Sequence, residues 1–201
     1  YFKSGDNISA SIFYKDFRNH IELVTFLDVS WQNVDKSNVM GIEFEGRKSL
    51  IQKRLEFRAN VTFVRSQTTF VRYTNVFGNT FVPVDTIKRP MFGQAPYILN
   101  GMLSYNADSL GLTLTVSYNI QGPRLAIASV TENVPDIYEL PRHLLDFKIT
   151  KKLGKYFSAS VTVRDILNAP VRRAYKFDNW DTNFDKFRYG TNYVLGISYR
   201  F

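Results

Sequence analysis

The last fourteen residues of the chain, Arg188 to Phe201, read RYGTNYVLGISYRF. From Tyr193 to Phe201 every second residue is apolar, and the alternate positions, counted from Asn192, include Asn192, Ser198 and Arg200. This alternation predicts a β-strand with one apolar and one polar face. In a transmembrane β-barrel the apolar face contacts lipid, the polar face lines the lumen, and aromatic side chains mark the membrane boundaries. An edge strand of a soluble β-sandwich alternates in the same way, so this stretch alone leaves both architectures open.

Seven further strands are predicted upstream of this one. They are expected at residues 7–26, 33–50, 55–71, 95–107, 111–129, 141–153 and 156–168, with bulges at 16–20 and at Gly122-Pro123, where the alternation falters. The predicted connections alternate in length: short turns fall at 51–54, 108–110 and 153–155, and longer loops at 27–32, 72–94, 130–140 and 169–187. This sorting is typical of outer-membrane barrels. The sequence therefore predicts an all-β, antiparallel, up-and-down transmembrane β-barrel segment of about eight strands, with residues 1–201 as one unit.

The composition agrees with such a barrel and excludes other classes. Charged residues make up 22% of the 201 residues and the mean hydropathy is −0.21, so a helical membrane protein is excluded. Cysteine is absent, which excludes disulfide and thiol chemistry. The net charge of +8 is spread singly along the chain without a basic stripe, so nucleic acid ranks last among the anionic partners. Because the chain opens without an initiator Met or a signal peptide, we expect a fragment or a processed product.

The sequence offers no convincing catalytic site, and we expect no enzyme activity, cofactor or metal. The two histidines, His20 and His143, lie far apart in the sequence. Glu43 and Glu45 share one strand face and could form an acid pair, but a solvated lumen face balanced by arginines is the favoured interpretation. One oxygen-rich stretch is a weaker calcium candidate whose spacing matches no known loop. It contains Asp178, Asn179, Asp181, Asn183 and Asp185.

Several motifs, in this order, resemble the C-terminal barrel part of TonB-dependent outer-membrane receptors of the Bacteroidota type. The most specific is GQAPYILN at 93–100, and the others are IFYKDF at 12–17, VMGIEFE at 39–45, PDIYELPR at 135–142, VRDILN at 163–168 and the terminal YRF. The resemblance implies a barrel of 22 strands filled by an N-terminal plug, of which this chain is about the last third. It also implies a multi-pass protein of the cell outer membrane, with the C-terminus on the periplasmic side. Its partners would be outer-membrane lipid, TonB acting through the plug, and a scarce solute taken up by energy-coupled transport.

In such receptors the outer loops and upper lumen bind the solute. Aromatic and arginine side chains in the predicted loops are therefore candidate substrate contacts, although each of them also fits a role in packing its own loop. These candidates are Trp31, Tyr73, Phe77, Arg172, Arg173, Tyr175, Trp180 and Phe184. Asn119, Gln121 and Arg164 are candidates within the lumen.

Two other functions remain open at this stage. The barrel could serve as a scaffold that docks surface lipoproteins or secretion and assembly partners through its long loops. It could also close on itself as a small eight-stranded barrel with an adhesive role.

Overall fold

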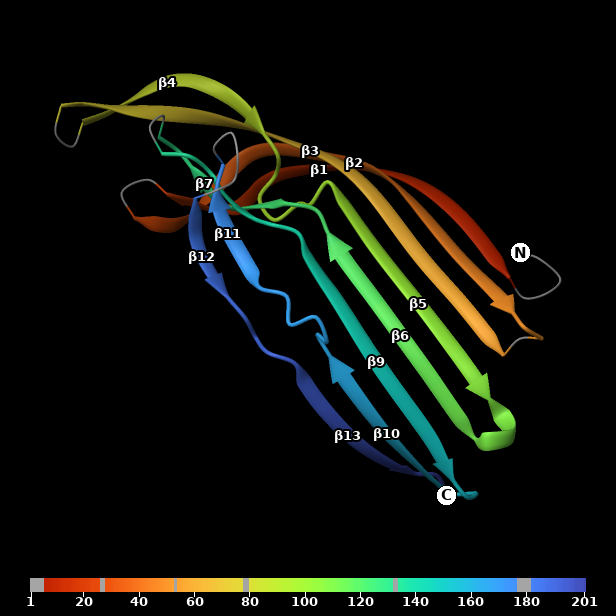
Figure 1. Ribbon diagram of the computed structural model, residues 1–201. Coiled ribbons are helices and arrows are strands. Elements are labelled where there is room, and N and C mark those ends of the chain that lie inside the picture. The colour runs from red at the N-terminus through yellow and green to blue at the C-terminus, as the bar shows by residue number, and fades with distance from the viewer. Residues whose placement is uncertain (1–5, 26–27, 53, 78–79, 132–133, 177–181) are drawn as a thin grey trace.

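The computed structural model describes residues 6–25, 28–52, 54–77, 80–131, 134–176 and 182–201, with Phe77 described by its backbone alone. Eight main strands lie side by side in a curved antiparallel sheet, and their order in the sheet is their order in the chain (Figure 1). They are β1 (Asn7–Thr25), β2 (Val29–Leu50), β3 (Leu55–Phe77), β5 (Tyr97–Ala107), β6 (Leu112–Gln121), β9 (Arg142–Leu153), β10 (Phe157–Arg164) and β13 (Asn192–Tyr199). The predicted all-β, up-and-down architecture of about eight strands is confirmed.

Five shorter strands complete the sheet; four lie in connections that the sequence predicted as loops, and the strand at 124–129 is the end of the predicted strand at 111–129. They are β4 (Thr80–Arg89), β7 (Arg124–Ser129), β8 (Ile137–Glu139), β11 (Val171–Tyr175) and β12 (Asn183–Phe187). The loop predictions at 72–94, 130–140 and 169–187 were wrong in this respect, and so was the loop at 28–32, because β2 already begins at Val29. Glycine, proline and charged residues in these segments hide a period of two, yet their backbone groups still pair with other strands.

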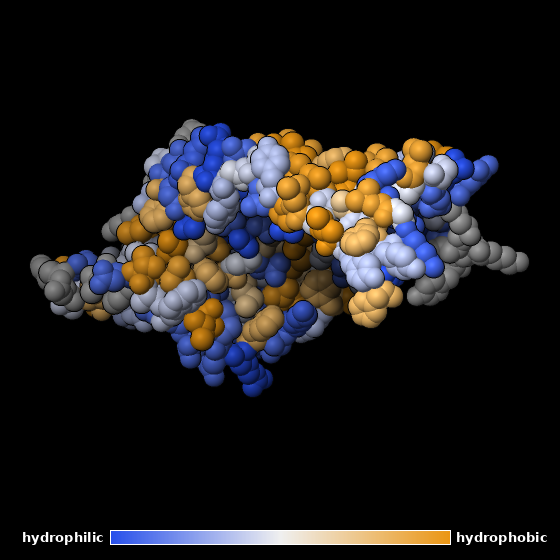
Figure 2. All heavy atoms as spheres, turned by 90° about the horizontal axis from the view of Figure 1, so that it is seen from below, coloured by the Kyte–Doolittle hydropathy of each residue, from blue (hydrophilic) through white to orange (hydrophobic). Residues whose placement is uncertain are grey.

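The register of the sheet assembles one apolar face. Apolar residues lie directly opposite one another across the six strands from β3 to β13, in the row Phe57, Leu103, Val116, Phe147, Val163 and Tyr193. Many large side chains of this face are exposed; Leu195 and Ile197 are 79% and 81% exposed. Figure 2 shows orange apolar side chains gathered over part of the surface. An exposed apolar face of this extent marks a surface made for an apolar surrounding such as lipid.

The short turns and the C-terminus lie at the same end of the sheet (Figure 1). Aromatic side chains collect beside the C-terminus at this end. The Tyr199 ring centroid is 5.0 Å from that of Phe157, 6.2 Å from that of Tyr156 and 6.4 Å from that of Phe201. At the same end, the β2–β3 turn uses Ile51 and Gln52, both with φ near +50°, and the β9–β10 turn uses Gly154 with φ of +74°. Tight turns with left-handed residues suit the twist of a hairpin.

No register shift occurs at the predicted bulge at 16–20. Strands β1 and β2 keep one register from the pair Asn7–Arg47 to the pair Thr25–Val29. Instead, Asn19 adopts a left-handed conformation with φ of +52°, and the ladder skips its pairing with Asp35. Buried positions change parity there: Ser37 and Val39 are buried on one side of the skipped pair, and Val34 lies on the other side of it. Asn19 therefore exchanges the two faces of the hairpin without inserting a residue.

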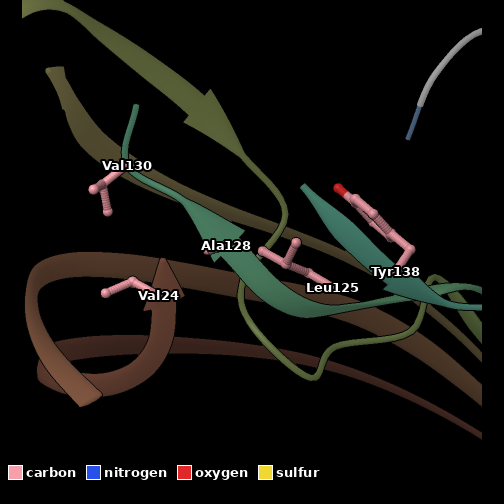
Figure 3. Close-up of a cluster of buried hydrophobic side chains, with 5 residues drawn as sticks. All are labelled: Val24, Leu125, Ala128, Val130 and Tyr138. Atoms are coloured by element: carbon pink, nitrogen blue, oxygen red, sulfur yellow. The ribbon is translucent and has the colours of Figure 1, made fainter. Parts of the chain in front are cut away.

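The predicted interruption at Gly122-Pro123 is a break between β6 and β7. A Cβ atom on Gly122 would lie 2.8 Å from the Tyr97 ring, and Pro123 has no N–H to continue the ladder. Strand β7 then pairs with the tip of β1 in parallel and with β8 in antiparallel fashion. A small buried cluster forms between these segments, with Val24, Leu125, Ala128, Val130 and Tyr138 as its members (Figure 3).

The eight main strands form an open sheet. Within the described residues β13 pairs with β10, and β1 pairs with β2 and β7, so no ladder joins β1 to β13. A self-closed eight-stranded barrel requires that ladder. The described part of the chain also contains no helix of the length and hydropathy needed to cross a membrane.

Candidate functional site

The inner face of the sheet carries a row of amide side chains that crosses four strands. Asn119 donates to the Oδ1 atom of Asn100 at 2.6 Å, and Asn100 donates to that of Asn60 at 3.4 Å. Asn60 in turn donates to the Oε1 atom of Glu43 at 2.6 Å. We call these four residues the amide row. Because each amide both donates and accepts, the row satisfies polar groups that face away from the apolar side of the sheet.

A groove of about 340 Å³ follows the amide row. Its polar lining consists of three asparagines, Ser117 and the charged residues Glu45, Arg58 and Asp146. Two glycines and the side chains of Ala59, Met102, Tyr118 and Leu144 complete it. Glu56 accepts from Arg47 at 2.9 Å and from Arg58 at 2.6 Å, and so holds two arginines that face each other directly across β2 and β3. These arginines balance Glu56, whereas Glu43 accepts from Asn60. The predicted balance of Glu43 and Glu45 by arginines stays a prediction, and the alternative of a catalytic pair gains no support from these contacts.

A buried ion pair anchors the end of the sheet opposite the short turns. Glu22 in β1 is fully buried, and its Oε2 atom accepts from Arg89 of β4 at 2.5 Å. Its Oε1 atom lies 3.0 Å from both His20 Nε2 and the backbone N–H of Phe92. The Arg89 guanidinium also lies 5.0 Å from the Phe70 ring centroid. Glu22 thus connects β1, β4 and the segment after β4, and its burial makes each of these partners costly to lose.

Two hydroxyl groups extend this cluster across the sheet. Ser37 and Thr68 are both buried, with their oxygens 2.5 Å apart, and Ser37 Oγ lies 3.2 Å from His20 Nε2. The contacts therefore run from β4 through β1 and β2 to β3, and they fix the β3–β4 hairpin against the β1–β2 hairpin.

A second compact junction lies where β10 ends. Asp165, with φ of +51°, pairs with Arg142 and accepts from the backbone N–H of Ala169 at 3.3 Å. Its own N–H donates to Asp146 at 2.8 Å, and its carbonyl accepts from Thr191 at 3.0 Å. The predicted strand at 156–168 therefore stops at Arg164, because Asp165 turns the chain toward β11.

Residues 1–166 match the family described as TonB dependent receptor-like, beta-barrel. The chain belongs to this family.

One solved structure shares the fold of this receptor barrel segment. It is a mutant of the ferric enterobactin receptor PfeA from Pseudomonas aeruginosa, with a TM-score of 0.60 and 17% sequence identity. The alignment covers all of this chain and 30% of that receptor chain. The comparison with curated proteins found no match.

Four of the predicted substrate contacts of the receptor barrel segment come together on the β11–β12 hairpin. Arg172 donates to Asn183 at 2.5 Å, and Arg173 forms an ion pair with Asp185 at 3.3 Å. The rings of Tyr175 and Phe184 meet edge to face at 5.8 Å. Their role in substrate binding stays a prediction.

The other predicted contacts are dispersed. Trp31 is 64% exposed on β2 and meets the Phe92 ring edge to face at 5.9 Å. Tyr73 lies in β3, where its N–H donates to Val130 at 2.8 Å. Phe77 ends β3 without a described side chain, and Trp180 lies outside the described residues.

The weaker candidates have separate surroundings. Asp178, Asn179 and Asp181 of the calcium hypothesis lie outside the described residues, and the described part of the chain holds no cluster of three or more potential metal ligands. Asn119 belongs to the amide row, whereas Gln121 donates to Glu139 at 3.4 Å. Arg164 is exposed at the end of β10.

Sequence reasoning missed three residues that organise the part of the sheet away from the short turns, namely Glu22, Arg89 and Asp165. Glu22 and Arg89 are 67 positions apart, so no spacing rule links them. A usable signal for Glu22 was its place between Ile21 and Leu23, where an acidic side chain interrupts an apolar stretch and needs a partner. For Asp165 the signal was the sequence DILN, in which Asp and Asn suit left-handed turn positions.

Proposed function

We propose that this chain is the C-terminal part of the barrel of an outer-membrane receptor that takes up a scarce solute. The observation that carries the proposal is the combination of family membership with a sheet whose outer face is apolar and whose inner face bears the amide row and its groove. A lipid-exposed face and a polar lumen are the two surfaces that a transport barrel needs.

In this proposal the rest of the receptor supplies the remaining strands and an N-terminal plug, to give a barrel of 22 strands. The solute binds at the outer end of the sheet and in the upper lumen, where the residues of the β11–β12 hairpin, Trp31, Tyr73, Phe77 and Trp180 are the proposed contacts. Energy reaches the plug through TonB. The short-turn end and the C-terminus then face the periplasm, and the long connections face the cell exterior.

The scaffold function has no specific observation in its favour, and a surface lipoprotein as partner stays a prediction. That the receptor is of the Bacteroidota type also stays a prediction. The open sheet argues against a self-closed adhesive barrel.

The experiment that tests this function is the recovery of the protein from isolated outer membranes, followed by intact mass measurement and a binding assay with the periplasmic domain of TonB. We expect a mass several times the 23.3 kDa of this chain and specific TonB binding. A mass near 23.3 kDa without TonB binding would contradict uptake and return the small-barrel function to first place.

A further inference from the structure

A cavity of about 260 Å³ lies where the interrupted segments of the outer end converge. Its lining comes from five parts of the chain: β3, the segment between β4 and β5, the break between β6 and β7, strand β8, and the residue after β11. A pocket assembled from segments so far apart in sequence exists only in the folded molecule. It is also distinct from the groove along the amide row, with which it shares no lining residue.

The walls of this cavity are rigid and largely apolar. Pro90, Pro96 and Pro123 line it, and each proline ring fixes its own backbone angle. Pro96 is held further because its carbonyl accepts from Val64 at 2.9 Å. Gly122, beside Pro123, donates to Tyr97 at 2.8 Å. Such walls keep their shape when empty, so a ligand would bind without a large cost of ordering them.

Three uncharged polar side chains line the cavity, and each of them can both donate and accept hydrogen bonds. Ser66 and Gln94 contribute a hydroxyl and an amide, and Tyr138 contributes a phenol. Burial of Tyr138, together with the negative charge of Asp136, raises the pKa of the phenol to about 12. Figure 3 shows Tyr138 projecting from β8 beside Leu125.

The charge of the lining is positive. Arg65 and Lys176 are cationic, and none of the described lining residues is acidic. The Lys176 ammonium lies 5.2 Å from the Tyr138 ring centroid, and the Lys176 backbone N–H donates to the backbone carbonyl of Asp136 at 2.9 Å. The chain thereby fixes the start of the Lys176 side chain beside the phenol. The Asp136 carboxyl acts on Lys176 and Tyr138 from outside the lining, and the two lining cations outnumber it, so the cavity favours an anionic group.

The volume limits the size of the ligand. A cavity of about 150 Å³ accommodates benzene. The present cavity therefore takes one six-membered ring with a small charged substituent. Proline and tyrosine surfaces suit the ring, and Lys176 with the phenol suits the charge.

We propose that this proline-walled cavity binds a compact organic anion, namely a single ring that carries one carboxylate. The proposal rests on the proposed uptake function, for which it names the substrate class. The carboxylate lies against Lys176 and Tyr138, and the ring lies between the prolines.

The test uses the full receptor, purified in detergent, and two pairs of probes that differ in charge. Benzoate is compared with benzamide, and glucuronate with glucose, by isothermal titration calorimetry. We expect at least one carboxylate to bind at least tenfold more tightly than its neutral partner. The Lys176→Gln variant should lose this preference, and Tyr138→Phe should weaken binding of the carboxylate several-fold while keeping the ring.

Lys186→Gln is the matched control, because it removes the same charge from the same hairpin outside the cavity. Equal binding of charged and neutral probes, absence of binding by all four, or equal losses in Lys176→Gln and Lys186→Gln would each overturn the proposal. TonB binding, measured on the same preparation, distinguishes failure of the cavity proposal from failure of the uptake function. A receptor that binds TonB but no carboxylate refutes the cavity proposal alone, and one that binds a carboxylate but no TonB refutes the uptake function alone.

Discussion

At the short-turn end the eight main strands pair in chain order, and their side chains alternate between the two faces. At the opposite end the chain leaves this order, since β7 pairs in parallel with β1, and β8, β11 and β12 extend the sheet from there. The first region consists of repeated local hairpins, whereas the second depends on contacts between segments far apart in sequence. Under the proposed function, the difference separates what a lipid surrounding requires, a uniform apolar face, from what solute recognition requires, an irregular surface.

The first prediction has the largest expected effect and concerns the irregular end. Replacing Glu22 with Ala leaves Arg89 buried without its counterion, and such losses cost about 3–5 kcal/mol. We expect the β3–β4 hairpin to lose most of its protection in hydrogen exchange. Asp85→Ala on the same hairpin is the control, because the Arg72–Asp85 pair is partly exposed and its loss should change protection little. Equal effects of both variants would show that burial of Glu22 does not decide the stability of this end.

The second prediction concerns the regular end. Val116→Arg places a charge in the middle of the apolar row, which costs about 2–4 kcal/mol in a lipid bilayer. Ser117→Arg, one residue further, places the same charge on the inner face opposite Asp146 and should cost little. The measurement is urea unfolding in lipid vesicles. A loss for Ser117→Arg as large as that for Val116→Arg would reverse the assignment of the two faces.

The third prediction addresses the boundary between the two regions. Asp165→Ala removes the ion pair with Arg142 and the hydrogen bond to Ala169, and it places alanine at a left-handed position. We expect a loss of about 1–3 kcal/mol, measured by urea unfolding in vesicles. Asp165→Asn keeps a side chain that tolerates the backbone conformation and should recover part of the loss. If both variants matched the wild type in stability, the contacts of Asp165 would not decide where β10 ends.

The fourth and smallest effect is a change in pH dependence. Burial raises the pKa of the Asp136 carboxyl above its ordinary value of 3.8, so the folded state binds its proton more tightly than the unfolded state does. Stability supplied by this group is therefore present below pH 3.8 and is lost as pH rises through the raised pKa.

Asp136→Asn should flatten this part of the stability profile, because the amide oxygen still accepts from Ser129 and does not ionise. Thermal unfolding between pH 3 and pH 7 checks the result. A profile that keeps its full slope in the variant would assign the slope to another group.

The contrast between the two ends also explains what the sequence could predict. Alternation from Leu112 to Gln121 and from Tyr193 to Phe201 is a local signal, and it gave the strands, their faces and the short turns correctly. The pairing of Glu22 with Arg89, and of Thr25 with Ser129, depends on how separate segments fold back. No local pattern contains that information. Of the site, Asn119 was predicted from its face, but its bond to Asn100 follows only from the register of β5 and β6.

The amide row has a direction. A carboxylate only accepts, so Glu43 obliges Asn60 to present its amino group, which leaves the Asn60 carbonyl for Asn100 and the Asn100 carbonyl for Asn119. One acidic residue at the head thereby sets the orientation of three amides on three other strands. With glutamine at position 43 the same chain of bonds would run equally well in either sense. The sheet would then contain two equivalent dipole arrangements in place of one.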